Sequence, residues 1–366
     1  MKRAWLVLIA SAALAELRVG RAAIEDSTIK ALVLDDGETR VALVICDAAA
    51  LEEATVRSSR KQLGAVIPEA NIMVAATGVR TTRGPVSPAK IAEAVRHALA
   101  SAQPSSALTG AGKEEAIGFY NRFLMKDGNV RTNPGRLNPD IVQPAGEADP
   151  DVTVAIFESA TGQPLAIFGS FSLHTGALDY APVISRTLAK LHGPELVTLW
   201  SSGASANVSH IDVRAQAPQP NAAAETRRVG TVLAGETIKA CARAVRIGEA
   251  KLGVARETVK LASLRAGQPP IECEVQVIAL GGDLAWIALP GDLWTELGAA
   301  IRKASPFPQT ILVGLANGSA GVLPTRKGYS GGDLEAGVRA AAGAGETIAD
   351  VASRLLAAAR RVAAKP

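Results

Sequence analysis

The chain has 366 residues, of which 48% are hydrophobic and 20% are charged. It is long and apolar enough to bury a large core, which excludes a disordered chain. Lysine and arginine outnumber aspartate and glutamate by only 39 to 35, and the excess is scattered, so a nucleic-acid-binding surface is excluded as well. The low aromatic content, 4%, and the many alanines are typical of α/β proteins.

The first residues have the pattern of a secretory signal peptide. Lys2 and Arg3 precede a short apolar stretch that ends in small residues. We therefore expect residues 1–15 to be a signal peptide and the mature chain to be secreted or periplasmic. A buried first strand or helix is the alternative. No later apolar run is long enough to span a bilayer.

Apolar runs with strand character alternate with helical patterns. In the first half of the chain, strands are expected over 30–36 and 39–47, with Asp36-Gly37 as a hairpin signal, and over 71–77. Helices are expected over 50–63 and from Pro88 to about residue 102, with Ser87 as N-cap. Residues 103–149 are rich in Gly, Pro and Asn and show little periodicity, which predicts a long substrate-facing loop.

The second half continues the alternation. Strands are expected over 152–159, 164–174, 195–202, 272–280, 284–290 and 310–317, and helices over 182–191, 223–245, 293–304 and at the C-terminus. This order predicts an α/β fold with a mixed, largely parallel sheet and helices on both faces. The three widely spaced cysteines, Cys46, Cys241 and Cys273, indicate buried free thiols, with one disulfide after export as the alternative.

Polar side chains follow five of the expected strands. In open α/β sheets, ligands bind beyond the carboxyl ends of strands, where such side chains meet. The residues concerned are, strand by strand, Arg80, Thr82 and Arg83; His174; Ser201, Ser205, Asn207 and Ser209; Asp292; and Ser319, Arg326 and Tyr329.

A histidine, a carboxylate and one more oxygen donor are a reasonable ligand set for hydrolytic zinc. Structural interpretations compete with this one: His174 as a hydrogen-bonded histidine at a strand end, Asp292 as a helix N-cap, and Tyr329 as an ordinary loop tyrosine. No HExxH or HxH pattern places two ligands on one element. A serine hydrolase using Ser205 is a further alternative, although its surroundings lack the final glycine of a nucleophile elbow.

The order of several segments resembles the N-terminal domain of the neutral/alkaline, non-lysosomal ceramidases and their shorter bacterial relatives. The resemblance is carried by DGNVRTNPGRLNPDIVQPAGEADPDV, SFSLHTGAL, and IALPGDLWTELG with SPFPQTILVGLANGSAGVLPTRKGY. It covers most of the chain after the expected signal peptide. It implies one ceramidase-like α/β domain over residues 16–366, without the C-terminal immunoglobulin-like domain of the ceramidases proper.

The resemblance also implies an activity, because the family consists of zinc amidases that cleave the N-acyl bond of ceramide. The family's His-Pro-Thr and Pro-Gly-Glu motifs resemble the segments at His174 and Asp292, and its tyrosine ligand matches Tyr329. These three residues are therefore the implied zinc ligands. The family's catalytic serine motif resembles the segment from residue 206 to residue 210, so that Ser209 keeps the hydroxyl.

Two further groups are implied to contact substrate. An Asn-Arg pair that contacts the substrate carbonyl in the family resembles Asn121-Arg122, and Asn207 stands where the serine motif has an acid. Arg122 would stabilise the oxyanion.

One motif departs from the family. The first zinc histidine lies there in a His-Thr-His-Ser-Gly-Pro motif, which reads RTTRGP here. Thr82 replaces the imidazole, and Arg80 and Arg83 add two cations that would repel zinc. We expect zinc binding to be weakened or lost.

Two functions therefore stay open. The first is a zinc-dependent hydrolase that cleaves an N-acyl amide in a ceramide-like lipid or a small molecule, with contact to a membrane surface left open. The second is a non-catalytic relative in which Arg80, Arg83 and Arg122 bind a carboxylate, phosphate or sulfate.

Overall fold

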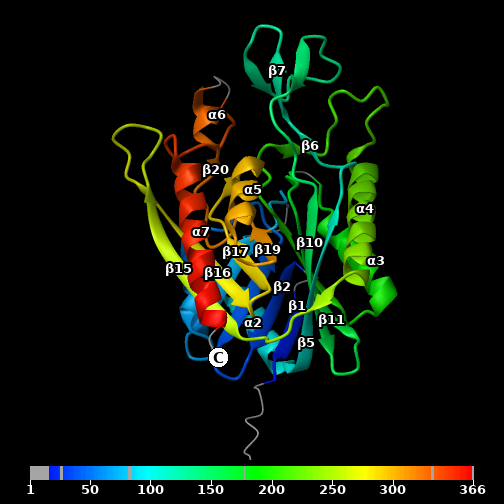
Figure 1. Cartoon of the computed structure of the whole chain (residues 1–366), viewed down its shortest axis with the longest axis vertical. Helices are drawn as coiled ribbons and strands as arrows, with labels where there is room; N and C mark the ends of the chain where they lie inside the picture. The colour runs from blue at the N-terminus through cyan, green and yellow to red at the C-terminus, as the bar shows by residue number, and fades with distance from the viewer. Residues whose placement is uncertain (1–15, 25–27, 81–84, 177, 331–333, 365–366) are drawn as a thin grey trace, which may run out of the picture.

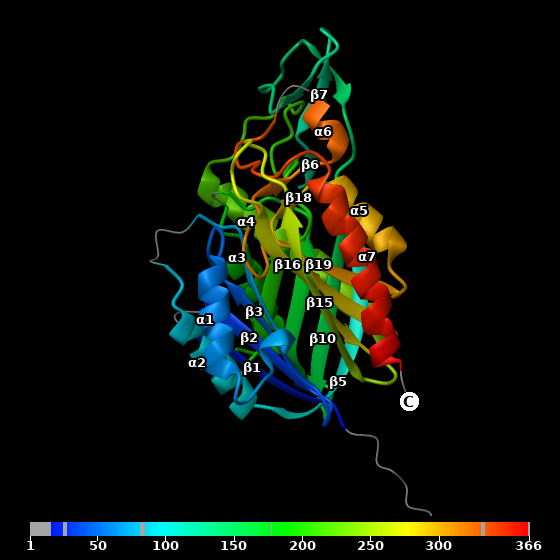
Figure 2. The same cartoon turned by 90° about the vertical axis from the view of Figure 1, so that its left-hand side faces the viewer.

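A computed structural model describes residues 16–24, 28–80, 85–176, 178–330 and 334–364. The expected signal peptide, residues 1–15, lies outside the described residues, and so do Thr82 and Arg83. The two main β-sheets of the described chain pack face to face, with helices on their outer faces (Figure 1), and three small sheets of two or three strands lie outside them. Figure 2 shows α1 and α2 on one side and α5 and α7 on the other, with both sheets between them.

The larger sheet has nine strands in the described chain. Its strands are, in spatial order, β12 (Val197–Ser202), β11 (Pro164–Phe171), β10 (Asp151–Ser159), β5 (Gln103–Lys113), β1 (Arg18–Ile24), β2 (Ile29–Asp35), β3 (Arg40–Cys46) and β4 (Ile72–Ala76), with β14 (Val245–Arg246) paired to β5. The pairs β11–β12 and β3–β4 are parallel, and the ladders between them are antiparallel. Hairpins such as the one at Asp36-Gly37 produce the antiparallel ladders.

The smaller sheet has the strand order β15 (Leu252–Leu261), β16 (Ile271–Leu280), β17 (Leu284–Ala288) and β19 (Gln309–Val313). β17 and β19 are parallel. The two sheets share an apolar core, in which Trp286 is fully buried with its ring centroid 6.3 Å from that of Phe157 and 6.1 Å from that of Phe168. Burial of such large aromatic side chains is the main force that holds the sheets together.

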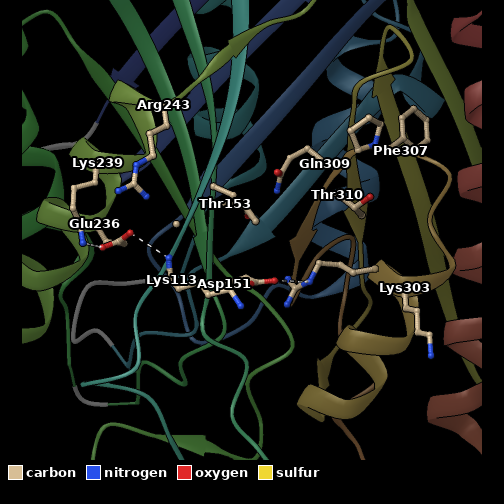
Figure 3. A pocket seen from close by; sticks show the side chains of 14 residues that line it. Lys113, Asp151, Thr153, Glu236, Lys239, Arg243, Lys303, Phe307, Gln309 and Thr310 are labelled. Atoms are coloured by element: carbon tan, nitrogen blue, oxygen red, sulfur yellow. Dashed lines mark hydrogen bonds and ion pairs between the residues drawn. The ribbon is translucent and has the colours of Figure 1, made fainter.

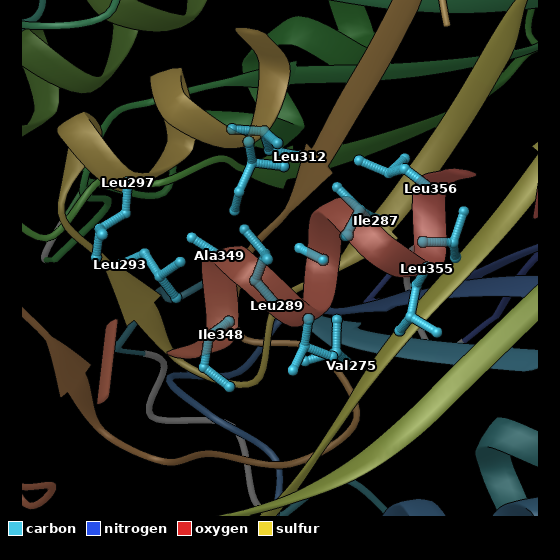
Figure 4. Close-up of a cluster of buried hydrophobic side chains, with 14 of the residues drawn as sticks. Val275, Ile287, Leu289, Leu293, Leu297, Leu312, Ile348, Ala349, Leu355 and Leu356 are labelled. Carbon is cyan, nitrogen blue, oxygen red and sulfur yellow. The ribbon is translucent and has the colours of Figure 1, made fainter. Parts of the chain in front are cut away.

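Helices cover the outer faces. α1 (Glu53–Leu63) and α2 (Pro88–Ala100) cover one half of the larger sheet, and α3 (Ala181–His192) and α4 (Ala222–Ala242) cover the other half. α5 (Thr295–Ala304) and α7 (Ala344–Ala363) cover the smaller sheet, and Figure 4 shows the aliphatic side chains between them. α7 buries Ile348, Leu355 and Leu356 at the spacing of one helical face.

Short elements gather at one end of the molecule, where β6, β7, β18, β20 and α6 lie (Figures 1 and 2). The remaining elements are β6 (Phe119–Tyr120), β7 (Arg122–Met125), β8 (Val130–Thr132), β9 (Ile141–Pro144), β13 (Val208–Ser209), β18 (Asp292–Leu293), β20 (Val322–Leu323), α6 (Arg326–Ser330) and the 3-10 helix η1 (Glu69–Asn71). This end is also where the parallel strands β11, β12, β17 and β19 finish.

The α/β class with a mixed sheet is confirmed, as is the start of α2 after Ser87 with proline at its first turn. The prediction of one long loop over residues 103–149 is wrong. β5 occupies its first eleven residues. Pairing with β10 and packing against α4, both distant in sequence, stabilise this strand although its own sequence shows no strand periodicity.

The cysteines are free, with Cys46 and Cys273 buried and Cys241 partly buried, as predicted. Burial raises the pKa of the Cys241 thiol to about 11, so these thiols are unreactive at neutral pH. In the part of the chain that the structure describes, no helix has the length and hydropathy needed to cross a membrane.

Glycine allows the two sheets to meet closely at the ends of β12 and β19. A Cβ atom on Gly314 would lie 2.5 Å from the carbonyl oxygen of Gly203 and 2.8 Å from that of Ser202. The Gly314 N–H instead donates a 2.8 Å hydrogen bond to the Ser202 carbonyl. A side chain at this position would separate the strand ends.

We therefore expect Gly314→Ala to lower the free energy of unfolding by about 1–3 kcal/mol, the usual cost of an overpacked position. Gly235→Ala is the matched control, because it lies within α4 and its Cβ would meet nothing within 4 Å. That control should stabilise the protein by up to about 1 kcal/mol. Urea titration followed by circular dichroism measures both, and equal effects of the two changes would contradict the close approach.

Candidate active site

His174 and Asp292 form a hydrogen-bonded pair at the carboxyl ends of the strands. The Nδ1 atom of His174 lies 3.0 Å from Oδ2 of Asp292. His174 follows β11, and Asp292 opens β18 shortly after β17, so the pair joins the two sheets. The Asp292 side chain is 8% exposed whereas that of His174 is 48% exposed. The imidazole is therefore accessible to small molecules, while the carboxylate that it contacts is buried.

The second oxygen of Asp292 is held by Ser205. Both the backbone N–H and the hydroxyl of Ser205 donate to Oδ1, at 3.3 Å and 3.0 Å. Ser205 follows β12 and is buried. The carboxylate therefore accepts hydrogen bonds on both oxygens, which fixes the plane of the group and directs Oδ2 at the imidazole.

The interpretation of Asp292 as a helix N-cap is wrong. α5 begins at Thr295 with Trp294 as its N-cap, and Asp292 lies in β18, which pairs in parallel with β20. The Asp292 side chain is therefore available for His174 and Ser205, not for the helix end.

The hydrogen bond that the His174 imidazole donates to Asp292 raises the pKa of that imidazole. Burial and the positive charge of Arg80 act in the opposite direction, and the negative charge of Glu335 adds to the increase. An imidazole that donates Nδ1–H to a carboxylate keeps the lone pair on Nε2, which makes that atom a proton acceptor.

Arg122 and Trp294 form a wall near the pair. The guanidinium of Arg122 lies 4.3 Å from the ring centroid of Trp294, and its Nη1 donates to the Thr132 hydroxyl at 2.8 Å.

Glu335 is a buried carboxyl beside the same tryptophan. Trp294 Nε1 donates to Glu335 Oε2 at 2.9 Å, while Oε1 of Glu335 is buried without a hydrogen-bond partner in the described chain. Burial raises the pKa of the Glu335 carboxyl, and Asp292 adds to that increase. The Arg122 guanidinium is thus held in a fixed plane within electrostatic range of Glu335, a carboxyl that also acts on His174.

A cavity of about 550 Å³ is linked to the pair through His210, and none of the groups named above lines it. Phe119, Leu178 and His210 contribute to its lining together with a proline-rich segment over 217–222. Burial lowers the pKa of His210, and the charge of His174 acts in the same direction, so His210 lies within electrostatic range of the pair. The lining of the cavity combines apolar residues with Arg136, Asp212, Glu225 and Arg228, and a cavity of this size has the usual character of a small-molecule site.

The fold is similar to two solved structures. Neutral ceramidase from Pseudomonas aeruginosa superposes with a TM-score of 0.74 at 16% identity, over 96% of this chain and 76% of that one. This chain has the neutral ceramidase fold. A second structure, a ceramidase complexed with C2, superposes with a TM-score of 0.69 at 16% identity, over 95% of this chain and 73% of that one. No family model matches the sequence, and no curated protein matches it significantly. The fold expected from the segment order is confirmed.

Zinc requires more donors than the described residues of this ceramidase fold supply. A zinc site takes at least three protein ligands. Among the residues that the structure describes, no group of three His, Cys, Asp or Glu side chains could hold a metal ion. The Tyr329 hydroxyl, in α6, donates to the Ala340 carbonyl at 2.7 Å, and burial raises its pKa, which disfavours a phenolate ligand. The described donors therefore do not fit zinc, and the chemistry proposed below uses the protein's own groups.

The other residues suggested by the sequence lie around this centre with different partners. The Oγ atom of Ser209 accepts a 3.1 Å hydrogen bond from the backbone N–H of Ile211. The residue before it, Val208, accepts a 3.4 Å hydrogen bond at its carbonyl from the backbone N–H of His174. The Arg80 N–H donates to the Gly176 carbonyl at 3.0 Å, which places the segment after β4 beside the His174 loop.

Asn207 and Asn121 are buried. Asn207 donates to Glu296 Oε2 at 2.8 Å and accepts from the Thr295 N–H at 2.8 Å, so its side chain anchors the start of α5 in the ceramidase fold. Oδ1 of Asn121 is buried and has no hydrogen-bond partner in the described chain, which is uncommon for a buried amide.

Three residues around this site were not predicted from the sequence. Glu335 and Trp294 have no motif spacing relative to His174, and only the folded chain brings them near it. Glu296 lies four residues after Asp292, and its Oε1 accepts a 2.6 Å hydrogen bond from the Tyr120 hydroxyl. Because Asp292 lies in β18 and Glu296 in the first turn of α5, no sequence spacing linked the two.

Asp292→Asn should lower the pKa of His174, because the amide removes both the charge and the strongest acceptor of Nδ1–H. A histidine with a raised folded pKa contributes stability below its unfolded value, 6.5, and loses that contribution as pH rises through the folded value. The wild type should therefore lose stability between 6.5 and the higher folded pKa, and the variant should lose less. Proton NMR titration of the His174 ring and pH-dependent urea unfolding measure the two effects; an unchanged pKa would show that the pair is not formed.

Proposed function

We propose that this protein hydrolyses an N-acyl amide bond, in a ceramide-like lipid or a related small molecule, with His174 as general base. The neutral ceramidase fold supports the choice of reaction class. The observation that carries the proposal is the hydrogen bond between His174 Nδ1 and Asp292 Oδ2, with the other carboxylate oxygen held by Ser205.

His174 moves the protons in this proposal. Nε2 takes a proton from a water molecule as the water oxygen bonds to the amide carbonyl carbon. Asp292 stabilises the resulting imidazolium through Nδ1–H. The imidazolium then gives its proton to the amide nitrogen as the carbon–nitrogen bond breaks, which yields a carboxylic acid and an amine. The half-exposed imidazole can reach the water and the amide nitrogen, and the buried carboxylate stabilises the imidazolium between the two steps.

Arg122 and Asn121 are assigned to the substrate carbonyl and amide. Arg122 is 2% exposed and its guanidinium lies over the Trp294 ring, so a substrate contact would cost little further side-chain entropy. A fixed guanidinium is suited to the negative charge that develops on the carbonyl oxygen. The Asn121 Oδ1 atom without a partner is suited to accept the substrate N–H.

Binding without catalysis is the second candidate. Its specific support is electrostatic, because the charge of Arg80 acts on His174 and that of Arg122 acts on Glu335. Two cations around one centre would bind a carboxylate, phosphate or sulfate.

The test is hydrolysis of a fluorogenic N-acyl amide by the wild type, His174→Ala and Asp292→Asn. We expect His174→Ala to lower kcat/KM by about 100-fold or more, since general base catalysis contributes at least that much. His97→Ala, on the exposed face of α2, is the matched control and should retain full activity.

Three outcomes would contradict this mechanism. No turnover by the wild type, with tight binding of the free fatty acid, would favour the binding function. Equal losses in the His174 and His97 variants would remove His174 from the reaction. Turnover that is abolished by a chelator and restored by zinc would show that a metal, not the imidazole, activates the water.

The two serines near the pair should differ in effect. Ser205→Ala removes a hydrogen bond to Asp292 and should lower kcat by about 3–10-fold, in line with a charge-assisted hydrogen bond that orients another group. Ser209→Ala should retain most of the activity if water is the nucleophile. Loss of activity in Ser209→Ala, together with a burst of acylated wild-type enzyme, would instead identify Ser209 as the nucleophile.

A further inference from the structure

A second cavity lies apart from the His174 centre, between α4, the β5 and β10 strands, and the segment that joins α5 to β19 (Figure 3). Its volume is about 710 Å³. None of its lining residues belongs to the active site described above. Nothing in the proposed hydrolysis requires it.

Cations dominate the lining, with five lysine or arginine side chains against two carboxylates. The two carboxylates already have partners. Glu236 forms an ion pair with Lys239, and Asp151 lies 3.9 Å from Arg302. The acids of the cavity are thus neutralised within the protein.

Three cations remain. Lys113, Arg243 and Lys303 form no ion pair in the part of the chain that the structure describes. Lys113 ends β5, Arg243 follows the last residue of α4, and Lys303 lies near the end of α5. In Figure 3 Lys303 points away from the other labelled residues, so Lys113 and Arg243 are the cations considered for a ligand.

Thr153 supplies an independent sign of a missing partner. Its side chain is 2% exposed, it lines the cavity, and its hydroxyl has no hydrogen-bond partner in the described chain. Buried hydroxyls without partners are rare in folded proteins. Figure 3 shows Thr153 between Arg243 on one side and Gln309 and Thr310 on the other.

We propose that this cavity binds a small organic phosphate monoester. The phosphate lies near Arg243 and Lys113 and accepts a hydrogen bond from the Thr153 hydroxyl, while the organic part faces Phe307 and Pro308. A dianionic phosphate matches two unpaired cations and a hydroxyl donor. The volume exceeds that of phosphate alone and falls in the range of small-molecule pockets.

Isothermal titration calorimetry of the full chain with phenyl phosphate tests the proposal. We expect a Kd of roughly 0.1–1 mM, weaker binding of inorganic phosphate, and no binding of phenol. Arg243→Gln should weaken phenyl phosphate about tenfold or more, the worth of a charge-assisted hydrogen bond. Lys61→Gln, an exposed cation in the last turn of α1, is the matched control and should leave the Kd unchanged.

Thr153→Val separates binding from stability. The hydroxyl has no partner among the described residues, so valine should not lower the thermal midpoint, whereas it should weaken the binding of phenyl phosphate several-fold. No heat up to about 10 mM ligand, or equal losses in Arg243→Gln and Lys61→Gln, would overturn the proposal. Association with phosphatidic acid vesicles without binding of phenyl phosphate would overturn it too, because the ligand would then be a lipid surface. Amide hydrolysis should be unchanged in all of these variants, so failure here leaves the proposed function intact.

Discussion

The candidate active site depends on the close approach of two sheets at their carboxyl ends. Two hydrogen bonds make the contact: Gly314 N–H donates to the Ser202 carbonyl, and the side-chain hydroxyl of Ser170 donates to the Leu312 carbonyl at 2.8 Å. A side chain at Gly314 would prevent it. Because His174 and Ser205 follow strands of the larger sheet and Asp292 follows a strand of the smaller one, their hydrogen bonds form only when the strand ends meet.

The shared apolar core makes this approach rigid. Trp286 of the smaller sheet packs against Phe157 and Phe168 of the larger one, and close-packed protein interiors deform little. A buried carboxylate is costly unless its oxygens are hydrogen-bonded, and Asp292 has donors on both. The rigid scaffold therefore holds a charged group where water cannot replace its partners.

The same fold accommodates a different donor set from the one that the family resemblance implies. The Tyr329 hydroxyl donates a hydrogen bond to the backbone carbonyl of Ala340, and the Asp292 carboxylate is hydrogen-bonded to His174. A fold specifies where strand ends converge, whereas the side chains at those ends determine the chemistry. The similarity to neutral ceramidase and the proposed proton-transfer mechanism are thus separate conclusions. The first depends on the course of the backbone, and the second on the side chains of His174, Asp292 and Ser205.

The sequence by itself determined the alternation of strands and helices, the hairpin at Asp36-Gly37, the start of α2 after Ser87 and the order of segments that indicated the ceramidase fold. The elements and the turn depend on residues close in sequence, where periodicity and turn propensity act directly, whereas the ceramidase fold was implied by the resemblance of the segments. It also singled out His174 and Asp292, since both directly follow apolar strands. Only the tertiary structure decided that β5 is a strand, that Asp292 contacts His174 and does not cap α5, and that Glu335 lies near the pair. Each of these depends on contacts between segments far apart in the chain, and the energy of such contacts cannot be read from local pattern.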